Sequence, residues 1–223
     1  MNIDKICEVI NNGGIVITPT DTIYGIMGDS LNEDVIRKVF EIKKRPFNKP
    51  LLLLMDSFEM VEQYTEEISE KERLLMDRYW PGLVTFILKK NDKVNELITS
   101  GNDTVGIRIP NNKDLLEIIR RLNRPVISTS ANITGTEVIT NTQLLEKDLI
   151  DNIDYIEDGG EVDSESSTII KIEDNKLVVL REGKLSREIE EYYKENLWKR
   201  LFILWDIQKY IKELIIIIIV IVY

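Results

Sequence analysis

Short apolar runs of strand length alternate with amphipathic segments of helix length along most of this chain. At the amino terminus, Ile3, Ile6, Cys7 and Ile10 follow the spacing of one helix face, and the run 15–17 after them reads as a buried strand. This alternation predicts an α/β layered domain, and consecutive strands near the end favour a mixed sheet over an entirely parallel one. Further helices are predicted after a cap at Asn32 and over residues 69–79, 113–122, 142–149 and 186–196, with strands at 51–55, 83–88, 105–109, 126–128, 168–172 and 177–180.

The chain shows no internal repeat and no proline-rich linker before about residue 190. Its 223 residues, 43% hydrophobic and 30% charged, suit one large domain with a real core. We therefore expect a catalytic or binding domain over residues 1–196 and a separate apolar tail over 197–223.

The tail ends in Leu214–Tyr223, which carries no charge. That run is about half of the roughly 20 apolar residues needed to cross a bilayer, and Lys212-Glu213 interrupts any extension of it. A spanning helix is disfavoured. A docking strand or helix is the preferred interpretation, while a weak membrane-surface contact and an altered reading frame at the end of the gene stay open.

The acidic balance of the chain limits its partners. It carries 39 acidic against 29 basic residues, a formal charge of -10, which argues against stable binding to DNA through a broad basic face. Cys7 is the one cysteine, so no internal disulfide can form and a reducing, cytoplasmic location is expected. The start Met1–Lys5 lacks the features of a secretory signal.

The sequence contains no histidine. This excludes Ser-His-Asp and Cys-His catalysis and removes the commonest metal ligand. Any chemistry must use lysine, arginine, hydroxyls, carboxylates and backbone amides.

The predicted strand 104–110 could form the floor of an anion site. Period-two alternation places Thr104, Gly106 and Arg108 on one face, so that a ligand could approach the backbone at the glycine between a hydroxyl and a guanidinium. The alternative is a half-exposed sheet face with an ordinary surface arginine.

Two other polar clusters flank predicted strands. Ser128, Ser130 and Asn132 follow an apolar strand, where hydroxyls and amides can bind a phosphate or carboxylate, or can simply cap a turn. Lys43, Arg45 and Lys49 form a compact cationic stretch, and Pro46 and Pro50 within it fix the direction of the backbone, although the stretch could also be a solvated helix end.

The polar clusters, taken in their order, resemble the YrdC-like threonylcarbamoyl-AMP synthase family over roughly residues 5–190. They are Pro19-Thr20-Asp21-Thr22-Ile23-Tyr24-Gly25, Lys43-Lys44-Arg45-Pro46 with Lys49-Pro50-Leu51, Thr104-Val105-Gly106-Ile107-Arg108, Ser128-Thr129-Ser130-Ala131-Asn132, Ser166-Ser167-Thr168 and Arg181-Glu182-Gly183. No G-x-x-x-x-G-K-[ST] and no G-x-G-x-x-G motif is present to suggest another nucleotide site.

The resemblance implies an α/β, YrdC-like layered fold, with a twisted mixed β-sheet flanked by helices and a concave substrate cavity. It implies an enzyme, a nucleotidyltransferase that forms threonylcarbamoyl-AMP and pyrophosphate from L-threonine, bicarbonate and ATP. Mg²⁺ would enter with ATP, and its ligands are not predicted. The product would pass to the threonylcarbamoyl transferase machinery that makes the t6A modification of tRNA.

The resemblance also implies roles for individual residues. The catalytic cations that face the phosphates would be Lys43, Arg45 and Lys49. The threonine pocket would contain Thr22, Arg108, Ser128 and Ser167. Tyr24 would shape that pocket. ATP would contact Arg45, Lys49, Thr104, Ser130, Asn132, Val138 and Arg181. One departure is Leu54, at a place where longer members often carry a histidine near threonine.

Other functions compete with the synthase. A YrdC-like module could bind double-stranded RNA or tRNA without catalysis, although the net charge of -10 argues against this. Carbamoyl transfer in hydrogenase maturation would require further modules, for which the chain lacks the length and the cysteines. If the tail were the functional element, the chain would be a membrane-surface adaptor.

Overall fold

The computed structural model describes residues 1–162 and 165–196. The chain divides into two compact units, Met1–Leu185 and Ser186–Tyr223. In the second unit, residues 186–196 are helical, as the sequence predicts, and the apolar tail 197–223 lies outside the described residues. Among the described helices, none has both the length and the apolar character needed to span a bilayer.

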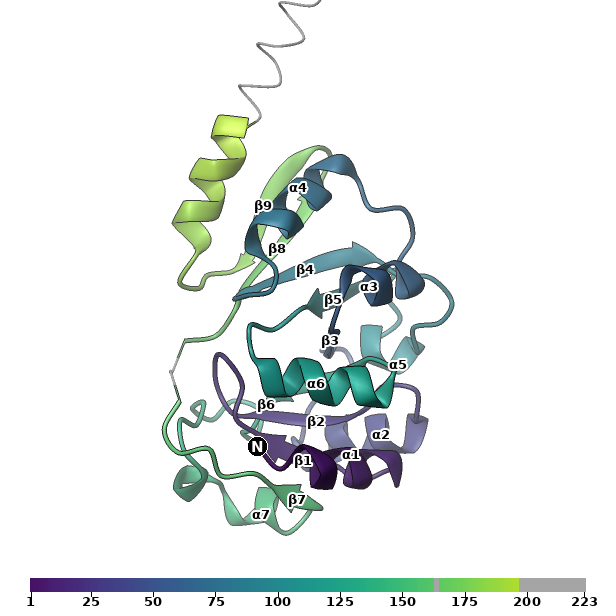
Figure 1. The fold of residues 1–223 in the computed structure, drawn as a ribbon, viewed down its shortest axis with the longest axis vertical. Coiled ribbons are helices and arrows are strands. Elements are labelled where there is room, and N and C mark those ends of the chain that lie inside the picture. Colours follow the sequence, from purple (N-terminus) through teal and green to yellow (C-terminus); the bar gives the residue numbers. More distant parts are fainter. Residues whose placement is uncertain (163–164, 197–223) are drawn as a thin grey trace, which may run out of the picture. The chain divides into compact units, whose positions relative to one another are not determined.

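The first unit contains a nine-stranded sheet, and helices connect many of its strands along the chain (Figure 1). The strands are β1 Val16–Thr18, β2 Gly25–Asp29, β3 Leu52–Leu54, β4 Val84–Lys89, β5 Thr104–Arg108, β6 Val126–Ser130, β7 Tyr155–Ile156, β8 Thr168–Glu173 and β9 Lys176–Arg181. The helices are α1 Ile3–Asn11, α2 Glu33–Ile42, α3 Phe58–Tyr64, α4 Glu70–Tyr79, α5 Glu96–Thr99, α6 Lys113–Leu122, the short 3₁₀ helix Thr142–Leu144 and α7 Lys147–Ile150.

The strand order is β7-β1-β2-β6-β3-β5-β4-β8-β9. Strands β1 and β7, β3 and β5, and β4 and β8 pair in parallel, and the other neighbours pair antiparallel. The predicted mixed sheet is therefore confirmed. Strands from distant parts of the chain, β6, β3 and β5, consequently lie side by side near the centre of the sheet.

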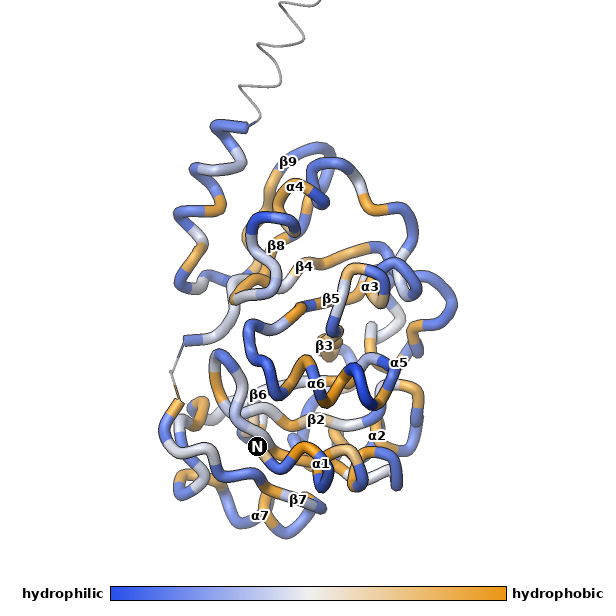
Figure 2. The backbone as a smooth tube through the Cα atoms, in the orientation of Figure 1, coloured by the Kyte–Doolittle hydropathy of each residue, from blue (hydrophilic) through white to orange (hydrophobic). Residues whose placement is uncertain are grey.

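Helix α2 shows how the local sequence sets the fold. The Asn32 side chain accepts hydrogen bonds from the backbone N–H groups of Asp34 and Val35, as expected of an N-cap. The apolar face of α2 is buried, and this helix packs on β2. Helix α1 packs on α6, β1 and β2, and Figure 2 shows hydrophobic and hydrophilic residues alternating along α1 and α6. Each helix thus buries one stripe against the sheet or its neighbours.

The sequence prediction was wrong for one helix, missed strand β2 inside the sheet, and also missed the short elements α3, α5 and β7. The helix predicted over 142–149 is two short pieces, because Leu145 and Glu146 between them adopt extended backbone angles. Strand β2 was missed, since its sequence Gly-Ile-Met-Gly-Asp holds residues that are rare in strands. Its neighbours β1 and β6 bond it on both sides, so tertiary pairing overrides the weak local preference.

Candidate functional site

A cavity of about 1180 Å³ lies over one face of the central strands. Leu52 of β3 pairs with Gly106 of β5 on one side and with Ser128 of β6 on the other, and all three line the cavity. The alternation predicted for β5 is observed: Thr104, Gly106 and Arg108 line the cavity, while the residues between them are buried beneath it. The cavity floor is therefore one face of the sheet.

Most of the residues predicted from the sequence face this cavity, although they come from distant parts of the chain. Those in its lining are Thr22, Arg45, Thr104, Arg108, Ser128, Ser130, Val138, Ser167 and Arg181. Four predicted residues are not in the lining, and they are Tyr24, Lys43, Lys49 and Asn132.

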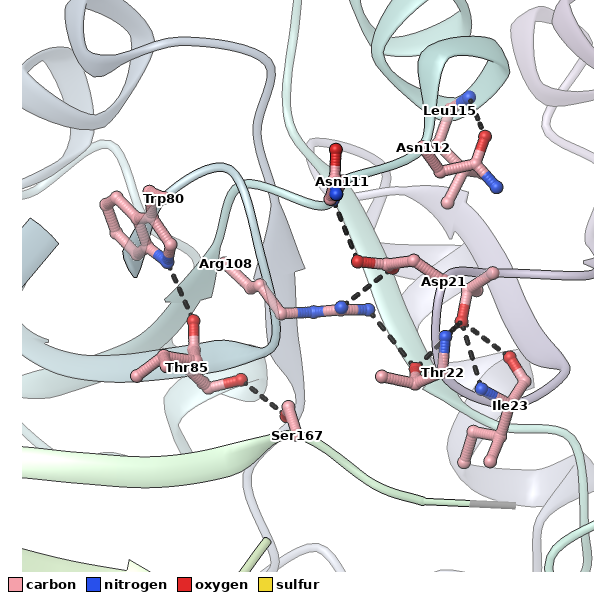
Figure 3. Close-up of polar contacts among 12 residues, drawn as sticks. Asp21, Thr22, Ile23, Trp80, Thr85, Arg108, Asn111, Asn112, Leu115 and Ser167 are labelled. Carbon is pink, nitrogen blue, oxygen red and sulfur yellow. Dashed lines mark hydrogen bonds and ion pairs between the residues drawn. The ribbon is translucent and has the colours of Figure 1, made fainter. Parts of the chain in front are cut away.

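Arg108 lies at the end of β5 with its side chain almost fully buried (Figure 3). Its Nη1 donates to Asp21 Oδ1 at 2.8 Å, and its Nη2 lies 3.5 Å from Thr22 Oγ1. The second Asp21 oxygen accepts the N–H of Asn111 at 2.8 Å. Arg108 Nε has no partner among the described residues. The guanidinium is thus oriented by Asp21 and keeps unused donor capacity, which suits binding of a carboxylate.

Arg181 and Ser167 form a second polar group beside the cavity. Arg181 Nε and Nη2 donate to the Ser167 carbonyl at 3.0 and 2.8 Å, and Nη2 also donates to Ser167 Oγ at 2.9 Å. Burial lowers the pKa of Arg181, and the charge of Arg108 lowers it further. Because burial and the nearby Arg108 both disfavour the charge of Arg181, an anion bound beside Arg181 would be stabilised.

Lys43 follows α2, is buried, and is not in the cavity lining. Its Nζ donates to the carbonyls of Ser130 and Asn132, the latter at 2.6 Å, and lies 3.4 Å from Asn132 Oδ1. Burial lowers the pKa of Lys43 to about 7, with a smaller contribution from Arg45. The lysine therefore holds the turn after β6 in place.

Asn132 belongs to the same turn. Its Oδ1 accepts from Ser130 Oγ at 2.5 Å, and its Nδ2 donates to the Thr136 carbonyl at 2.6 Å. These contacts direct the amide into the loop and leave Ser130 at the cavity surface.

The proline-rich loop after α2 carries the other predicted cations. Arg45 Nε and Nη2 donate to the carbonyls of Lys49 and Pro50 at 3.0 and 2.8 Å, and these bonds stabilise the loop that carries Arg45. Arg45 also lines the cavity. Burial lowers the pKa of Arg45. Lys49 is exposed, and its ammonium bonds no other side chain within the described part of the chain.

Tyr24 is fully buried and ties two segments together. Its hydroxyl donates to the Gly160 carbonyl at 2.7 Å and accepts from the Gly159 N–H at 3.0 Å. Its own carbonyl accepts the Ala131 N–H at 2.9 Å. Tyr24 thus joins the segment after β7 to the turn after β6.

Sequence reasoning missed two residues of the site. Asp21 lies inside the Pro19–Gly25 cluster, and its carboxylate is the obvious partner for a buried arginine, but no spacing rule links it to Arg108. Thr85 lines the cavity from β4 and contacts Ser167, and its only signal is the strand alternation that places it with Ile87 and Lys89.

The cavity is not uniformly positive. The carboxylates in its lining belong to Glu66, Glu67, Glu72, Asp103, Glu173 and Asp174. Apart from Glu66, Glu67 and Asp103, they come from α4 and the β8–β9 hairpin, whereas Arg45, Ser128 and Ser130 come from the loop after α2 and from β6. An anionic ligand is therefore expected to favour the end formed by β6 and the loop after α2. The described residues contain no cluster of three acidic, cysteine or histidine side chains that could hold a metal ion.

Comparisons with known proteins identify a family and relatives that are similar in sequence to this chain. A profile of the Sua5–YciO–YrdC family, described as "Telomere recombination", matches residues 8–183. A protein of Methanocaldococcus jannaschii, whose name assigns it provisionally as a threonylcarbamoyl-AMP synthase, is 42% identical over 176 residues, covering 78% of this chain and 82% of that protein. The threonylcarbamoyl-AMP synthase of Pyrococcus abyssi is 37% identical over 180 residues, covering 80% of this chain and 53% of that protein.

A solved structure shares the fold. The crystal structure of P. abyssi Sua5 complexed with L-threonine superposes with a TM-score of 0.77 at 36% identity, covering 81% of this chain and 54% of that one. The chain thus spans about half the length of these P. abyssi proteins. The profile match, the identity and the shared fold agree: the chain belongs to the Sua5–YciO–YrdC family and is a homologue of the threonylcarbamoyl-AMP synthases.

Proposed function

We propose that this protein is an L-threonylcarbamoyladenylate synthase, which forms threonylcarbamoyl-AMP and pyrophosphate for the t6A modification of tRNA. One observation carries the proposal: Arg108, Arg181 and the hydroxyls of Thr22, Ser128 and Ser167 converge on one cavity from separate strands and loops. Such a site suits an amino acid carboxylate beside a nucleotide. The names of its homologues support the same activity.

The threonine carboxylate would pair with Arg108. That guanidinium is buried, oriented by Asp21 and short of one partner, so it can accept an anion without reorganising. Thr22, Ser128 and Ser167 would supply the neighbouring hydroxyls. The L-threonine bound to P. abyssi Sua5 supports an amino acid site in this fold.

The reaction requires no protein nucleophile, which agrees with a chain that lacks histidine. Bicarbonate and the threonine amine would combine to a carbamate with loss of water. A carbamate oxygen would then attack the α-phosphorus of ATP, and pyrophosphate would leave. Holding the reactants in line can supply roughly 7–11 kcal/mol of the barrier.

The cations would stabilise the leaving pyrophosphate. Arg45 reaches the cavity from a loop that it closes itself, and Lys49 carries an exposed ammonium on the same loop. Lys43 would act through the turn at Ser130 and Asn132, whose carbonyls accept hydrogen bonds from its Nζ. Thr104, Ser130, Val138 and Arg181 would contact the nucleotide, and Asn132, which lies outside the lining, would act by holding the Ser130 hydroxyl. Mg²⁺ would enter with ATP as part of the substrate.

The product would be consumed by a threonylcarbamoyl transferase that acts on tRNA. A cytoplasmic location suits this role, and the free, buried thiol of Cys7 is compatible with a reducing compartment.

The test is pyrophosphate release from MgATP by the purified chain, with L-threonine or bicarbonate omitted in turn. We expect release only when both are present. Because the chain spans about half of the P. abyssi relatives, the same assay asks whether the matched region is sufficient. Release that is independent of threonine would contradict the proposal.

The competing function is a double-stranded RNA or tRNA-binding module. The carboxylates of Glu66, Glu67 and Glu173 in the cavity lining argue against a phosphate backbone at that end. Binding of tRNA at physiological salt, without any pyrophosphate release, would favour the module instead.

A further inference from the structure

Thr85 lies at the junction of the two polar groups of the cavity. Its strand β4 pairs with β5, which carries Arg108, and with β8, which Ser167 precedes (Figure 3). The side chain is 1% exposed. Its hydroxyl lies 2.8 Å from Ser167 Oγ, and its methyl group lies 3.5 Å from the place that a Cβ on Gly106 would occupy. The orientation of both branches of Thr85 is therefore fixed by contacts.

Donor and acceptor counting gives the direction of the hydrogen bond between these hydroxyls. Ser167 Oγ already accepts a hydrogen from Arg181 Nη2 at 2.9 Å. Within the described residues, Ser167 Oγ is the one hydrogen-bond partner of the Thr85 hydroxyl. If Ser167 donated to Thr85, the buried hydrogen of Thr85 would have no acceptor among the described residues, and such unsatisfied donors are costly. Thr85 therefore donates, and Ser167 accepts twice.

A serine that accepts twice has one free group, its own hydrogen. Since Thr85 and Arg181 occupy the acceptor sites, that hydrogen is available to an acceptor in the cavity, which Ser167 lines. The surroundings favour an anionic acceptor. No carboxylate among the described residues lies within ion-pair distance of Arg181. Arg108 pairs with Asp21 through Nη1, but its Nε has no hydrogen-bond partner among the described residues.

We propose that Thr85 is a positioning residue, which directs the Ser167 hydroxyl to donate to an anionic oxygen of the substrate. The inference deepens the proposed function and rests on it for the identity of that substrate. The oxygen belongs either to the carboxylate of L-threonine or to the carbamate made from its amine. Thr85 itself acts through Ser167 and does not touch the reacting atoms.

The experiment compares Thr85→Val, which replaces the hydroxyl by a methyl group, with Thr85→Ser, which keeps it. Calorimetric titration with L-threonine alone tests the carboxylate, and the KM for bicarbonate during pyrophosphate release tests the carbamate. We expect Thr85→Val either to weaken the affinity for L-threonine or to raise the KM for bicarbonate by about tenfold, which corresponds to the loss of one hydrogen bond. Thr85→Ser should keep the same quantity within about twofold of its wild-type value. Thr99→Val, at a buried threonine that bonds a helix carbonyl outside the cavity, is the matched control.

A double-variant cycle separates positioning from general packing. In a Ser167→Ala background, Thr85→Val should cause no further loss, because the hydroxyl that it orients is gone. The inference would be overturned if the losses from Thr85→Val and Ser167→Ala were additive. It would also be overturned if Thr85→Val and Thr85→Ser caused equal losses, or if neither the threonine affinity nor the KM for bicarbonate changed. A wild-type chain that binds L-threonine but releases no pyrophosphate would refute the proposed synthase, while the binding arm would still decide the role of Thr85. A wild-type chain that binds no L-threonine would overturn both.

Discussion

The Arg108 guanidinium is fixed by the Asp21 carboxylate, with 2.8 Å between Nη1 and Oδ1 and with side-chain exposures of only 5% and 9%. The same carboxylate accepts the backbone N–H of Asn111 beyond β5. Asp21 therefore connects the loop after β1 to the end of β5 and aims the arginine. A buried pair of this kind is costly to break from one side, because it leaves an uncompensated charge.

Asp21→Asn should weaken both the fold and the site. The amide keeps the shape but loses the charge that Arg108 needs, so we expect a loss of about 3 kcal/mol in the free energy of unfolding. The affinity for L-threonine should fall about tenfold or more, since the guanidinium is no longer held. Urea denaturation and calorimetric titration measure the two effects.

Asp29→Asn provides the comparison for Asp21→Asn. Asp29 pairs with Arg124 at 2.9 Å in a partly buried position away from the cavity. Its substitution should reduce stability without changing threonine affinity. Equal affinities in the Asp21 and Asp29 variants would show that Asp21 has no role in the site.

The burial of Lys43 predicts a stability that rises with pH. Its pKa falls from 10.5 to about 7 on folding, so between these values the unfolded chain binds more protons and stability increases with pH. Below pH 7 the penalty for the buried charge is fully present. Between pH 7 and pH 9, the free energy of unfolding of the wild type should rise by about 1–3 kcal/mol more than that of Lys43→Met.

Urea denaturation at several pH values measures this difference for Lys43. Lys5→Met, at an exposed lysine on α1, serves as the control that removes a lysine without removing a buried charge. Parallel pH profiles for the wild type and Lys43→Met would contradict the prediction.

Arg45→Ala should abolish pyrophosphate release and leave the fold intact. The guanidinium lines the cavity, and its bonds to the Lys49 and Pro50 carbonyls are contacts within one loop, so the loss in stability should be about 1 kcal/mol. Loss of a group that stabilises developing charge typically costs about 100-fold or more in rate. Arg37→Ala, on the exposed face of α2, should change neither property. Retained turnover in Arg45→Ala would remove its catalytic assignment.

Tyr24→Phe should loosen the segment that follows β7. The variant leaves the Gly159 N–H and the Gly160 carbonyl without their partner, which should cost about 1–2 kcal/mol. Hydrogen exchange at the Gly159 amide should become faster. Tyr155→Phe removes a hydroxyl that donates to Glu157 near the surface and bonds neither Gly159 nor Gly160, so it should leave the Gly159 amide protected. Unchanged exchange in Tyr24→Phe would show that the segment is held by other contacts.

The sequence predicted elements best where local signals agreed. The capped, amphipathic α2 and the alternating β5 are present as expected, because capping and burial favour the same boundaries. Strand β2 could not be predicted, since its two glycines carry no strand preference and its pairing with β1 and β6 depends on distant residues. The mixed character of the sheet was predictable from the order of elements alone.

The site was predictable as a set of residue types but not as a network. Strand alternation alone predicts that Thr104, Gly106 and Arg108 share one face, and all three line the cavity. No local pattern could show that Lys43 bonds the Ser130 carbonyl at the end of β6, because that contact spans 87 residues of sequence. The same applies to Asp21 and Thr85, whose partners belong to other strands and loops. Long-range hydrogen bonds, rather than residue identities, are what the sequence leaves undetermined.

Gly106→Ala tests whether substrates lie on the floor of the cavity. A Cβ at this position would meet Ile87 Cδ1 at 3.3 Å and Leu52 Cβ at 3.5 Å, contacts that a small shift of the flexible Ile87 side chain can relieve. The fold should therefore lose less than about 1 kcal/mol. The new methyl group would stand between Thr104 and Arg108, where a ligand approaches the backbone, and should raise the KM for a substrate about tenfold or more.

Gly28→Ala gives the opposite signature to Gly106→Ala. Its Cβ would lie 2.5 Å from Val35 Cγ1 between β2 and α2, outside the cavity lining, so overpacking should cost about 1–3 kcal/mol of stability. The KM values of the folded fraction should be unchanged, because the strain is confined to the helix-covered side of β2. If Gly106→Ala instead kept wild-type KM values with an intact fold, substrates would have to bind away from β5, and the pairing of a carboxylate with Arg108 would lose its geometric basis.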